Sequence, residues 1–446
     1  MLHNAGAARR LLVLSLAIAR RVLGQSCNGF NITSDESAEA ARRCPDINGD
    51  VMIFPDNITD VNLDGVENIN GSLSVHVGCQ WWWTDKSYGC SQKTLLRSVS
   101  STTLKTINER LSISQNENIS SLSFPKLASV GRSFNLDLDN LEYLDITSLE
   151  TIEYLRLDTP KLSTMKHENL RNVTAGMYSD LEIMATSLES VDSLIRSPLD
   201  LRRLRIEKSL KLKQITLGIS SASEVYIAGN YSWYSDSGEK IEDGQSGSAK
   251  LVLGGPETKE MRIQSLRIMN STASIERASS LVNLEVDFFQ LDGNYFMQHL
   301  ALPFDKLRSA QIRDAPALKW LSNVPQAVDW KQFTIDIADM PMLNLSSEYM
   351  IDEKGDLVRS WYWPQSDLRD VQVYANVTNQ FFDTFPKGDE SSTGLAVYNY
   401  GAFGSMDCDA LKKEKEFEYG LRCANVNDEA SLSTRQATTK QPFLSS

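Results

Sequence analysis

A short unit that recurs along the chain constrains its fold more than any other feature of the sequence. The clearest copy spans residues 116–138 and ends in an alternating stretch, in which polar residues separate Phe134, Leu136 and Leu138. That period of two is typical of a strand with one buried face. Degraded copies follow at steps close to twenty residues, and such repeats indicate a solenoid in which each turn packs only on its neighbours.

The repeat also predicts where each strand is centred. The first three centres are Ile113, Leu136 and Leu155, at steps of 23 and 19 residues. Later centres are expected near Leu204, Val225, Leu266, Val286, Ile312, Ile335 and Trp361. Many strands end in Asn or Asp, whose side chains bond the local backbone and suit solenoid corners. These residues are Asn116, Asn140, Asp158, Asp180, Asn230, Asn270, Asp314, Asp339 and Asn376.

The ends of the repeat array carry short helical runs next to cysteines. Residues 33–36 form a capping-box-like start for a helical run over 38–43, and a similar run is expected over 410–418. Six cysteines allow fifteen pairings, of which the simplest joins sequence neighbours. That hypothesis pairs Cys27 with Cys44, Cys79 with Cys90, and Cys408 with Cys423. We expect no zinc and no other cofactor, because the cysteines lack zinc-ligand spacing and no His pair lies nearby.

Composition changes along the chain predict five segments. Residues 1–25 read as a secretory signal peptide, with two arginines before a short apolar run and a small-residue cleavage site. The solenoid is expected over 26–229 and 261–423, with a Gly/Ser/acidic insertion loop or hinge at 230–260 and a disordered Ser/Thr-rich tail at 424–446. The apolar run has about nine residues against the roughly twenty that a bilayer requires, so the mature chain is expected to have no transmembrane helix.

Secretion agrees with the distribution of glycosylation sequons. Nine Asn-x-Ser/Thr sites occur, at Asn31, Asn57, Asn70, Asn118, Asn172, Asn230, Asn270, Asn344 and Asn376. The formal net charge of −13 argues against nucleic acid as a partner, because phosphate binding needs a basic footprint. We therefore expect an extracellular protein.

Motifs for catalysis are absent from the sequence. No nucleophile elbow, phosphate loop or His-Glu-x-x-His occurs, so no catalytic residue is assigned. Asp137, Asp158 and Asp180 sit near equivalent points of successive repeats, as in a β-helix enzyme that acts on polysaccharides. A corner role fits them as well, because Asn replaces Asp at other repeats and acid/base chemistry would not allow that.

Aromatic residues and the outward strand face are the candidate binding groups. Trp81, Trp82 and Trp83 are candidates for stacking on sugar rings. Residues 361–363, Trp-Tyr-Trp, suit either the same role or the core, since the two tryptophans share one face of a strand. The outward face is expected to present Asn135, Asp137, Arg156, Arg267, Gln311, Arg313, Asp336 and Gln372, as a binding platform or as a solvated charged face.

The Ile-x-Gly-x-Leu and Phe-Pro-x-Leu-x-x-Val-Gly repeats, together with the terminal cysteine pairs, resemble fungal GPI-anchored cell-wall organisation proteins. The resemblance implies a mainly β, right-handed solenoid of leucine-rich, receptor-L-domain-like repeats with short disulfide-tied capping helices. It also implies a non-catalytic glycoprotein of the cell surface or wall, with wall polysaccharide or surface proteins as partners. The printed C-terminus, residues 441–446, lacks the apolar signal of a lipid anchor, which predicts a freely secreted protein or a longer natural chain.

The sequence is also compatible with two other functions. One is a receptor-like or adhesive module for a wall glycan or a protein ligand. The other is a polysaccharide-active β-helix enzyme. An intact aromatic patch would favour the first, and carboxylates clustered in a groove would favour the second.

Overall fold

The computed structural model confirms a mainly β fold, with 52% strand and 6% helix arranged as a β-solenoid of about 14 turns. It describes residues 26–76, 94–168, 170–174, 179–229, 249–324, 333–351, 356–363, 368–387, 394–399, 406–416 and 421–425. The expected signal peptide and most of the expected tail therefore lie outside the described residues. The chain divides into two compact units, the first ending at Leu188 and the second beginning at Glu189.

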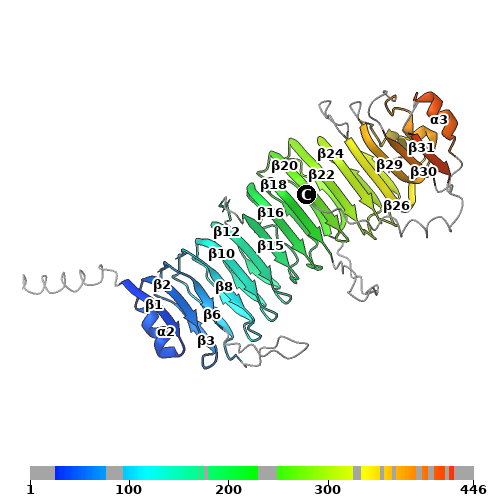
Figure 1. Ribbon diagram of the computed structural model, residues 1–446. Helices are drawn as coiled ribbons and strands as arrows, with labels where there is room; N and C mark the ends of the chain where they lie inside the picture. Colours follow the sequence, from blue (N-terminus) through cyan, green and yellow to red (C-terminus); the bar gives the residue numbers. More distant parts are fainter. Residues whose placement is uncertain are drawn as a thin grey trace, which may run out of the picture. The chain divides into compact units, whose positions relative to one another are not determined.

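The first unit consists of two parallel sheets and one helix (Figure 1). Its main sheet contains β1 (Ser26–Ile32), β2 (Asp46–Ile53), β4 (Asn68–Ile69), β5 (Leu73–Val75), β7 (Thr106–Ile107), β8 (Leu111–Ser114), β10 (Ser129–Asp137), β12 (Thr151–Asp158), β14 (Asn172–Val173) and β15 (Asp180–Met184). The second sheet contains β3 (Asp60–Asn62), β6 (Ser98–Ser100), β9 (Ser121–Ser123), β11 (Tyr143–Asp145) and β13 (Thr164–Lys166). Each turn of the solenoid thus adds one long or two short strands to the main sheet.

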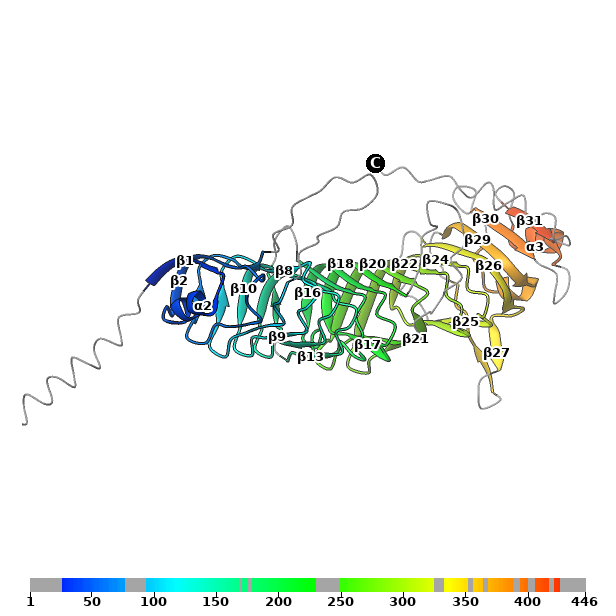
Figure 2. The ribbon, with the colours of Figure 1, turned by 90° about the horizontal axis from the view of Figure 1, so that it is seen from below.

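The second unit repeats this plan with longer strands. Its main sheet contains β16 (Leu199–Glu207), β18 (Ile219–Ala228), β20 (Glu260–Met269), β22 (Asn283–Asp292), β24 (Lys306–Arg313), β26 (Phe333–Leu345), β29 (Leu368–Val377), β30 (Leu395–Asn399) and β31 (Leu421–Asn425). Shorter strands are β17 (Gln214–Leu217), β19 (Ala249–Leu253), β21 (Thr272–Arg277), β23 (His299–Leu302), β25 (Trp320–Asn323), β27 (Tyr349–Ile351) and β28 (Leu357–Arg359). Within this unit, Figure 2 shows β17 and β21 on the side of the turns opposite the main sheet. The pair β27 and β28 is antiparallel.

Apolar side chains stack in columns inside the second unit. Leu204, Val225, Leu266, Phe289 and Ala310 are consecutive register partners, and all are buried. Each of these residues is preceded by two residues that are not buried and then by another buried apolar residue. Two consecutive outward residues mark a local bend, as at a β-bulge, and they interrupt the period of two.

This bend corrects several of the predicted strand centres. Phe289, rather than Val286, is the register partner of Leu266, because the bend separates the two buried positions by three residues. In the first unit Leu136 pairs with Leu157 instead of Leu155. Two further predicted strand centres, near residues 312 and 361, do not coincide with the column of buried residues. Ile312 lies two residues beyond the column position Ala310, and Trp361 follows β28 outside any strand.

Residues in the left-handed region of backbone space close several turns. The residue that follows a long strand has a positive φ at Lys208 (53°), Asn270 (44°) and Asp314 (48°). Asparagine and aspartate tolerate this conformation better than other side chains, so the predicted corner role holds at two of the three positions. Asn116 closes its corner differently, since its buried Oδ1 accepts hydrogen bonds from the N–H groups of residues 118 and 119 at 3.0 and 3.3 Å.

Both predicted caps are present, and each carries a disulfide. Helix α2 (Asp35–Arg42) begins after Ser34, whose side chain forms a capping box with Ser37, and Cys27 on β1 is bonded to Cys44 beyond the helix. Helix α3 (Cys408–Glu414) starts two residues earlier than predicted and ends before the predicted boundary. The pairing of sequence neighbours is confirmed for two of the three pairs, and Cys79 and Cys90 lie outside the described residues.

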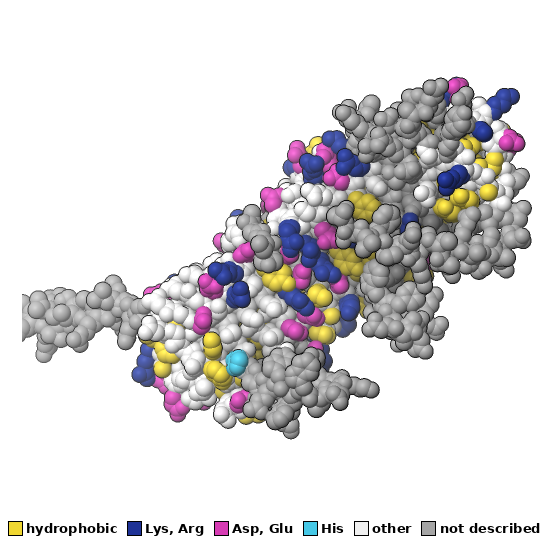
Figure 3. All heavy atoms as spheres, viewed as in Figure 1, with side chains coloured by type: hydrophobic (Ala, Val, Ile, Leu, Met, Phe, Trp, Pro, Cys, Tyr) yellow, Lys and Arg dark blue, Asp and Glu magenta, His cyan; other side chains and the backbone are white. Residues whose placement is uncertain are grey.

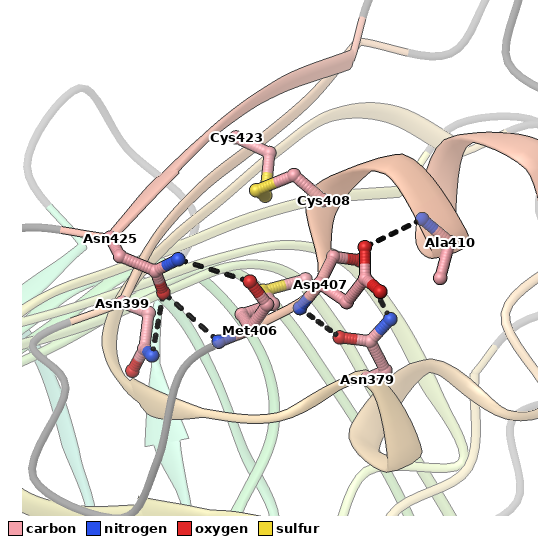
Figure 4. The surroundings of a disulfide bond; sticks show 8 residues. All are labelled: Asn379, Asn399, Met406, Asp407, Cys408, Ala410, Cys423 and Asn425. Atoms are coloured by element: carbon pink, nitrogen blue, oxygen red, sulfur yellow. Dashed lines mark hydrogen bonds between the residues drawn. A yellow bond between two sulfur atoms is a disulfide. The ribbon is translucent and has the colours of Figure 1, made fainter.

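Asparagine side chains join the C-terminal cap to the last turns (Figure 4). The disulfide between Cys408 and Cys423 bridges α3 and β31. Asn425 on β31 donates to the Met406 carbonyl and accepts from the Met406 N–H, both at 3.0 Å. Asn379 bonds both backbone groups of Asp407 in the same way, at 2.8 and 3.0 Å. The cap is therefore held by four amide hydrogen bonds in addition to the covalent bridge.

Part of the expected insertion at 230–260 is regular solenoid. Residues 230–248 lie outside the described residues, but Ala249–Leu253 forms β19, which pairs in parallel with β17 and β21. Alternating buried residues at Ala249, Leu251 and Leu253 explain why this stretch joins the sheet. The prediction of an insertion is thus wrong for residues 249–253.

Replacing Cys27 and Cys44 together by Ser should loosen the N-terminal cap. Opening a loop of this size costs about 3 kcal/mol by the chain-entropy estimate, so the amides of α2 and β1 should exchange with solvent roughly a hundredfold faster. Hydrogen exchange read by mass spectrometry measures this, with β12 amides as the internal control. Unchanged exchange in α2 would contradict a stabilising role for the bridge.

Candidate interaction surface

Five strands of the second unit form a block in which eight residues of each strand stay in register. The block consists of residues 200–207 (β16), 221–228 (β18), 262–269 (β20), 285–292 (β22) and 306–313 (β24). The second, fifth and seventh positions of every strand are apolar and buried. The other positions point outward except for Ala228 and Met269, which are buried, and we call the outward side chains the arginine platform.

The platform is basic in an acidic protein. It carries eight basic and six acidic side chains, a net charge of +2, whereas the whole chain has −13. The basic residues are Arg202, Arg203, Arg205, Arg262, Arg267, Lys306, Arg308 and Arg313. The acidic residues are Asp200, Glu207, Glu224, Glu285, Asp287 and Asp292. Figure 3 shows Lys and Arg side chains next to Asp and Glu side chains on this face of the second unit.

One carboxylate on β18 contacts two arginines of the neighbouring strands. Glu224 Oε2 lies 3.1 Å from Arg203 Nε, and its Oε1 lies 3.9 Å from Arg267 Nη1. These side chains are about a third exposed, so the ion pairs contribute little to stability. Their consequence is geometric, because they fix where the guanidinium groups point.

Two aromatic rings of the platform lie beside arginine side chains. The guanidinium of Arg205 is 5.4 Å from the centroid of the Tyr226 ring, and that of Arg267 is 5.8 Å from the Phe288 ring, both within cation–π range. Partial burial, followed by repulsion from Glu207, raises the pKa of Tyr226, so its hydroxyl stays protonated at physiological pH. The platform thus offers guanidinium groups, two ring faces and one phenol.

The sequence predicted part of this surface. It placed Arg267, Gln311 and Arg313 outward, and the structure puts Arg267 and Gln311 in one row, with Gln290 between them. That row continues to Asp336 and Gln372 by backbone register. Sequence reasoning missed Arg203, Arg205, Tyr226 and Phe288, although counting from the buried centres at 204 and 225 would have found the first three.

The predicted outward residues of the first unit also form rows. Asn135, Arg156 and Glu182 are successive register partners, and Tyr154 donates from its hydroxyl to Glu182 Oε2 at 3.0 Å. Burial, followed by the neighbouring Glu182 charge, raises the pKa of Tyr154 to about 12. Arg156 lies 3.4 Å from Asp158, in the next row. On the outward face of the first unit, these charged side chains therefore contact neighbouring polar or oppositely charged groups.

The predicted column of three carboxylates contains only two. Asp137 is the register partner of Asp158, but Asp180 pairs with Tyr154 and is buried at the start of β15. Burial, followed by repulsion from Asp158, raises the pKa of Asp137. The structure therefore brings together two of the three acids on which the enzyme interpretation rested.

The second aromatic candidate belongs to the core. Trp361 and Trp363 are 0% and 3% exposed, and their rings pack on Phe381. The indole N–H of Trp363 donates to the Phe381 carbonyl at 2.8 Å, which satisfies its polar group. Of the two interpretations of residues 361–363, the structure therefore supports the core and not sugar stacking. Trp81, Trp82 and Trp83 lie outside the described residues.

Exposure separates the sequon asparagines into two groups. Asn31, Asn57, Asn70, Asn118 and Asn172 are exposed in the first unit. In the second unit Asn270 and Asn376 are buried and Asn344 is partly buried, while Asn230 lies outside the described residues. The side-chain amide of Asn376 donates to the Pro341 carbonyl at 2.7 Å. None of the nine sequons falls within the platform residues.

No group of three or more His, Cys, Asp or Glu side chains in the described part of the chain is placed to hold a metal ion. None of the helices described there is long and apolar enough to span a membrane.

Comparison with known proteins gave no match. No protein-family model, no curated protein and no solved structure is significantly similar to this chain.

Substituting Asp137 by Asn should stabilise the protein at neutral pH. Because the folded-state pKa is raised, the native state holds this proton more tightly than the unfolded state, and stability falls as the pH rises through that pKa. The gain should be small at pH 7, because Asp137 is exposed and solvent screens the repulsion, and it should vanish near pH 3. Thermal unfolding at the two pH values measures it, with the exposed Glu117→Gln as the control. A loss of stability at pH 7 would show that Asp137 makes a favourable interaction instead.

Glycan occupancy should follow asparagine exposure. The five exposed sequons of the first unit should carry glycans after expression in a fungal secretory host, and Asn270 and Asn376 should not, because both side chains are buried. Peptide mass spectrometry after endoglycosidase treatment in heavy-oxygen water marks each occupied asparagine. Full occupancy at Asn376 would be incompatible with its buried hydrogen bond to Pro341.

Proposed function

We propose that this chain is a non-catalytic, N-glycosylated protein of the fungal cell surface or wall that contributes to wall organisation. The observation that carries the proposal is the pair of disulfides, one at each end of the array, that tie α2 to β1 and α3 to β31. Structural disulfides persist in oxidising compartments, and an extracellular solenoid is exposed at its two terminal turns. The secretory-type N-terminus and the exposed sequons support the same compartment.

The assignment to the wall is supported by the resemblance of the repeats and cysteine pairs to wall organisation proteins. A solenoid suits such a role physically, since its rows of outward side chains repeat at the spacing of the strands. It offers a long, regular surface to a polymer or to a neighbouring protein. The proposed activity is binding and organisation, with no bond made or broken.

A receptor-like or adhesive module is the second candidate, and the arginine platform favours it. Arg and aromatic residues are enriched where proteins bind their partners. Here Glu224 contacts Arg203 and Arg267, and Arg205 and Arg267 lie over the rings of Tyr226 and Phe288. The two candidates share a binding surface and differ in where the protein resides. An enzyme remains third, because only Asp137 and Asp158 are adjacent among the predicted acids.

Fractionation of the native host tests the proposal. Antibody detection in the medium, in detergent-extracted membranes and in isolated walls, with and without a phospholipase that cleaves lipid anchors, should find the glycosylated protein in wall or membrane. Detection only in the medium would favour the adhesive or receptor-like module. An unglycosylated intracellular protein with reduced cysteines would overturn both.

Loss of the gene tests the role in the wall. The deletion strain should be more sensitive to wall-binding dyes than its parent, and the wild-type gene should restore growth. Unchanged sensitivity in a host that does place the protein in its wall would contradict a contribution to wall organisation.

A further inference from the structure

We propose that the arginine platform binds a linear anionic polysaccharide through carboxylate or phosphate groups that recur along the polymer. The inference rests on the proposed extracellular function and names the partner class of its binding surface. Three properties of the platform lead to it: the kind of cation, the arrangement of the charges, and the groups between them.

The cations are of the type that recognises planar or tetrahedral anions. Seven of the eight basic platform residues are arginines. A guanidinium presents a rigid fork of N–H donors that matches carboxylate and phosphate oxygens in pairs, whereas an ammonium group acts as a point charge. Arg262 and Arg308 are exposed, so their forks are accessible from solvent. An excess of arginine over acid on one face of an acidic chain favours an anionic partner.

The basic side chains form stripes on alternate strands. All eight lie on β16, β20 and β24, and among the platform residues β18 and β22 carry none. Neighbouring strands are about 4.8 Å apart, so the stripes recur about every 10 Å across the sheet. Glu285 on β22 pairs across the strands with Lys306 at 2.7 Å, but over the whole platform the basic residues outnumber the acids. A polymer with charges at a fixed interval fits a regular set of stripes better than an acidic polypeptide does, because the charges of a polypeptide vary with its sequence.

The strands between the stripes carry groups that suit a sugar chain. Tyr226 on β18 and Phe288 on β22 are partly exposed rings, and aromatic faces stack on the apolar faces of sugars. Gln290 and Gln311 extend the row of Arg267 and offer amide donors and acceptors to hydroxyl groups. No sequon lies within the platform, so glycans attached to the chain do not originate there.

Binding measurements with defined polymers test this proposal. The secreted full-length protein is immobilised and titrated with polygalacturonate, with its uncharged methyl ester, with a phosphodiester-bearing mannan and with poly-L-glutamate, at low and physiological salt. At least one of the two anionic polysaccharides should bind, and affinity should fall as salt rises. The triple variant Arg262→Gln, Arg267→Gln and Arg308→Gln should bind about tenfold more weakly, because three cationic contacts are lost.

A matched variant separates the platform from general charge. Arg97→Gln, Arg110→Gln and Arg171→Gln remove three exposed arginines of the first unit and should change the affinity less than twofold. Circular dichroism checks that both variants are folded. The proposal is overturned if neither anionic polysaccharide binds, if the methyl ester binds equally well, if both variants lose affinity alike, or if polyglutamate binds as tightly with the same sensitivity to the platform variant. A protein that resides in the wall but binds none of these polymers would remove this inference and leave the proposed function in place.

Discussion

The parallel register between successive turns is the constraint on which the rest of the structure depends. Each long strand of the platform block buries apolar residues at three equivalent positions, and these stack on the same positions of the next turn, as in the column from Leu204 to Ala310. A slip by one residue would turn these side chains outward and bury charged ones, so the apolar columns fix the register strongly. The same register determines which outward side chains are neighbours, without any further interaction.

Surface chemistry follows from that register. Once Leu204, Val225 and Leu266 are aligned, Arg205, Tyr226 and Arg267 must also be neighbours, one position further along each strand. The solenoid thus converts a one-dimensional pattern of charges into rows and stripes on a sheet. Its end turns lack a neighbour on one side, which explains why the helices and disulfides are found there.

Much of the fold could be predicted from the sequence, because the signals are local. The alternating stretch at 134–138 and the cysteines beside short helical runs each indicated an element that the structure contains. The alignment of each strand with its neighbour was harder to predict from the sequence. Val286 and Phe289 are both buried and apolar, and only the bend between them decides which one stacks on Leu266.

The candidate site was predictable only in part, for a similar reason. Outward positions such as Arg267 follow from alternation, but a cluster such as Glu224 with two arginines depends on contacts between turns. Burial of sequons and of aromatic residues is also a tertiary property. Asn376 and Trp363 look in sequence like sites for sugars, yet both are enclosed by residues of neighbouring turns.

Arginine labelling on isolated host walls tests the role of the platform most directly. Phenylglyoxal modifies accessible guanidinium groups, and mass spectrometry reports the extent of modification at each arginine in the free and the wall-bound protein. The account predicts that Arg262, Arg267 and Arg308 are protected by the wall and that Arg97 and Arg110 are modified equally in both states. Equal modification of the platform arginines in both states, or protection confined to the first unit, would contradict it.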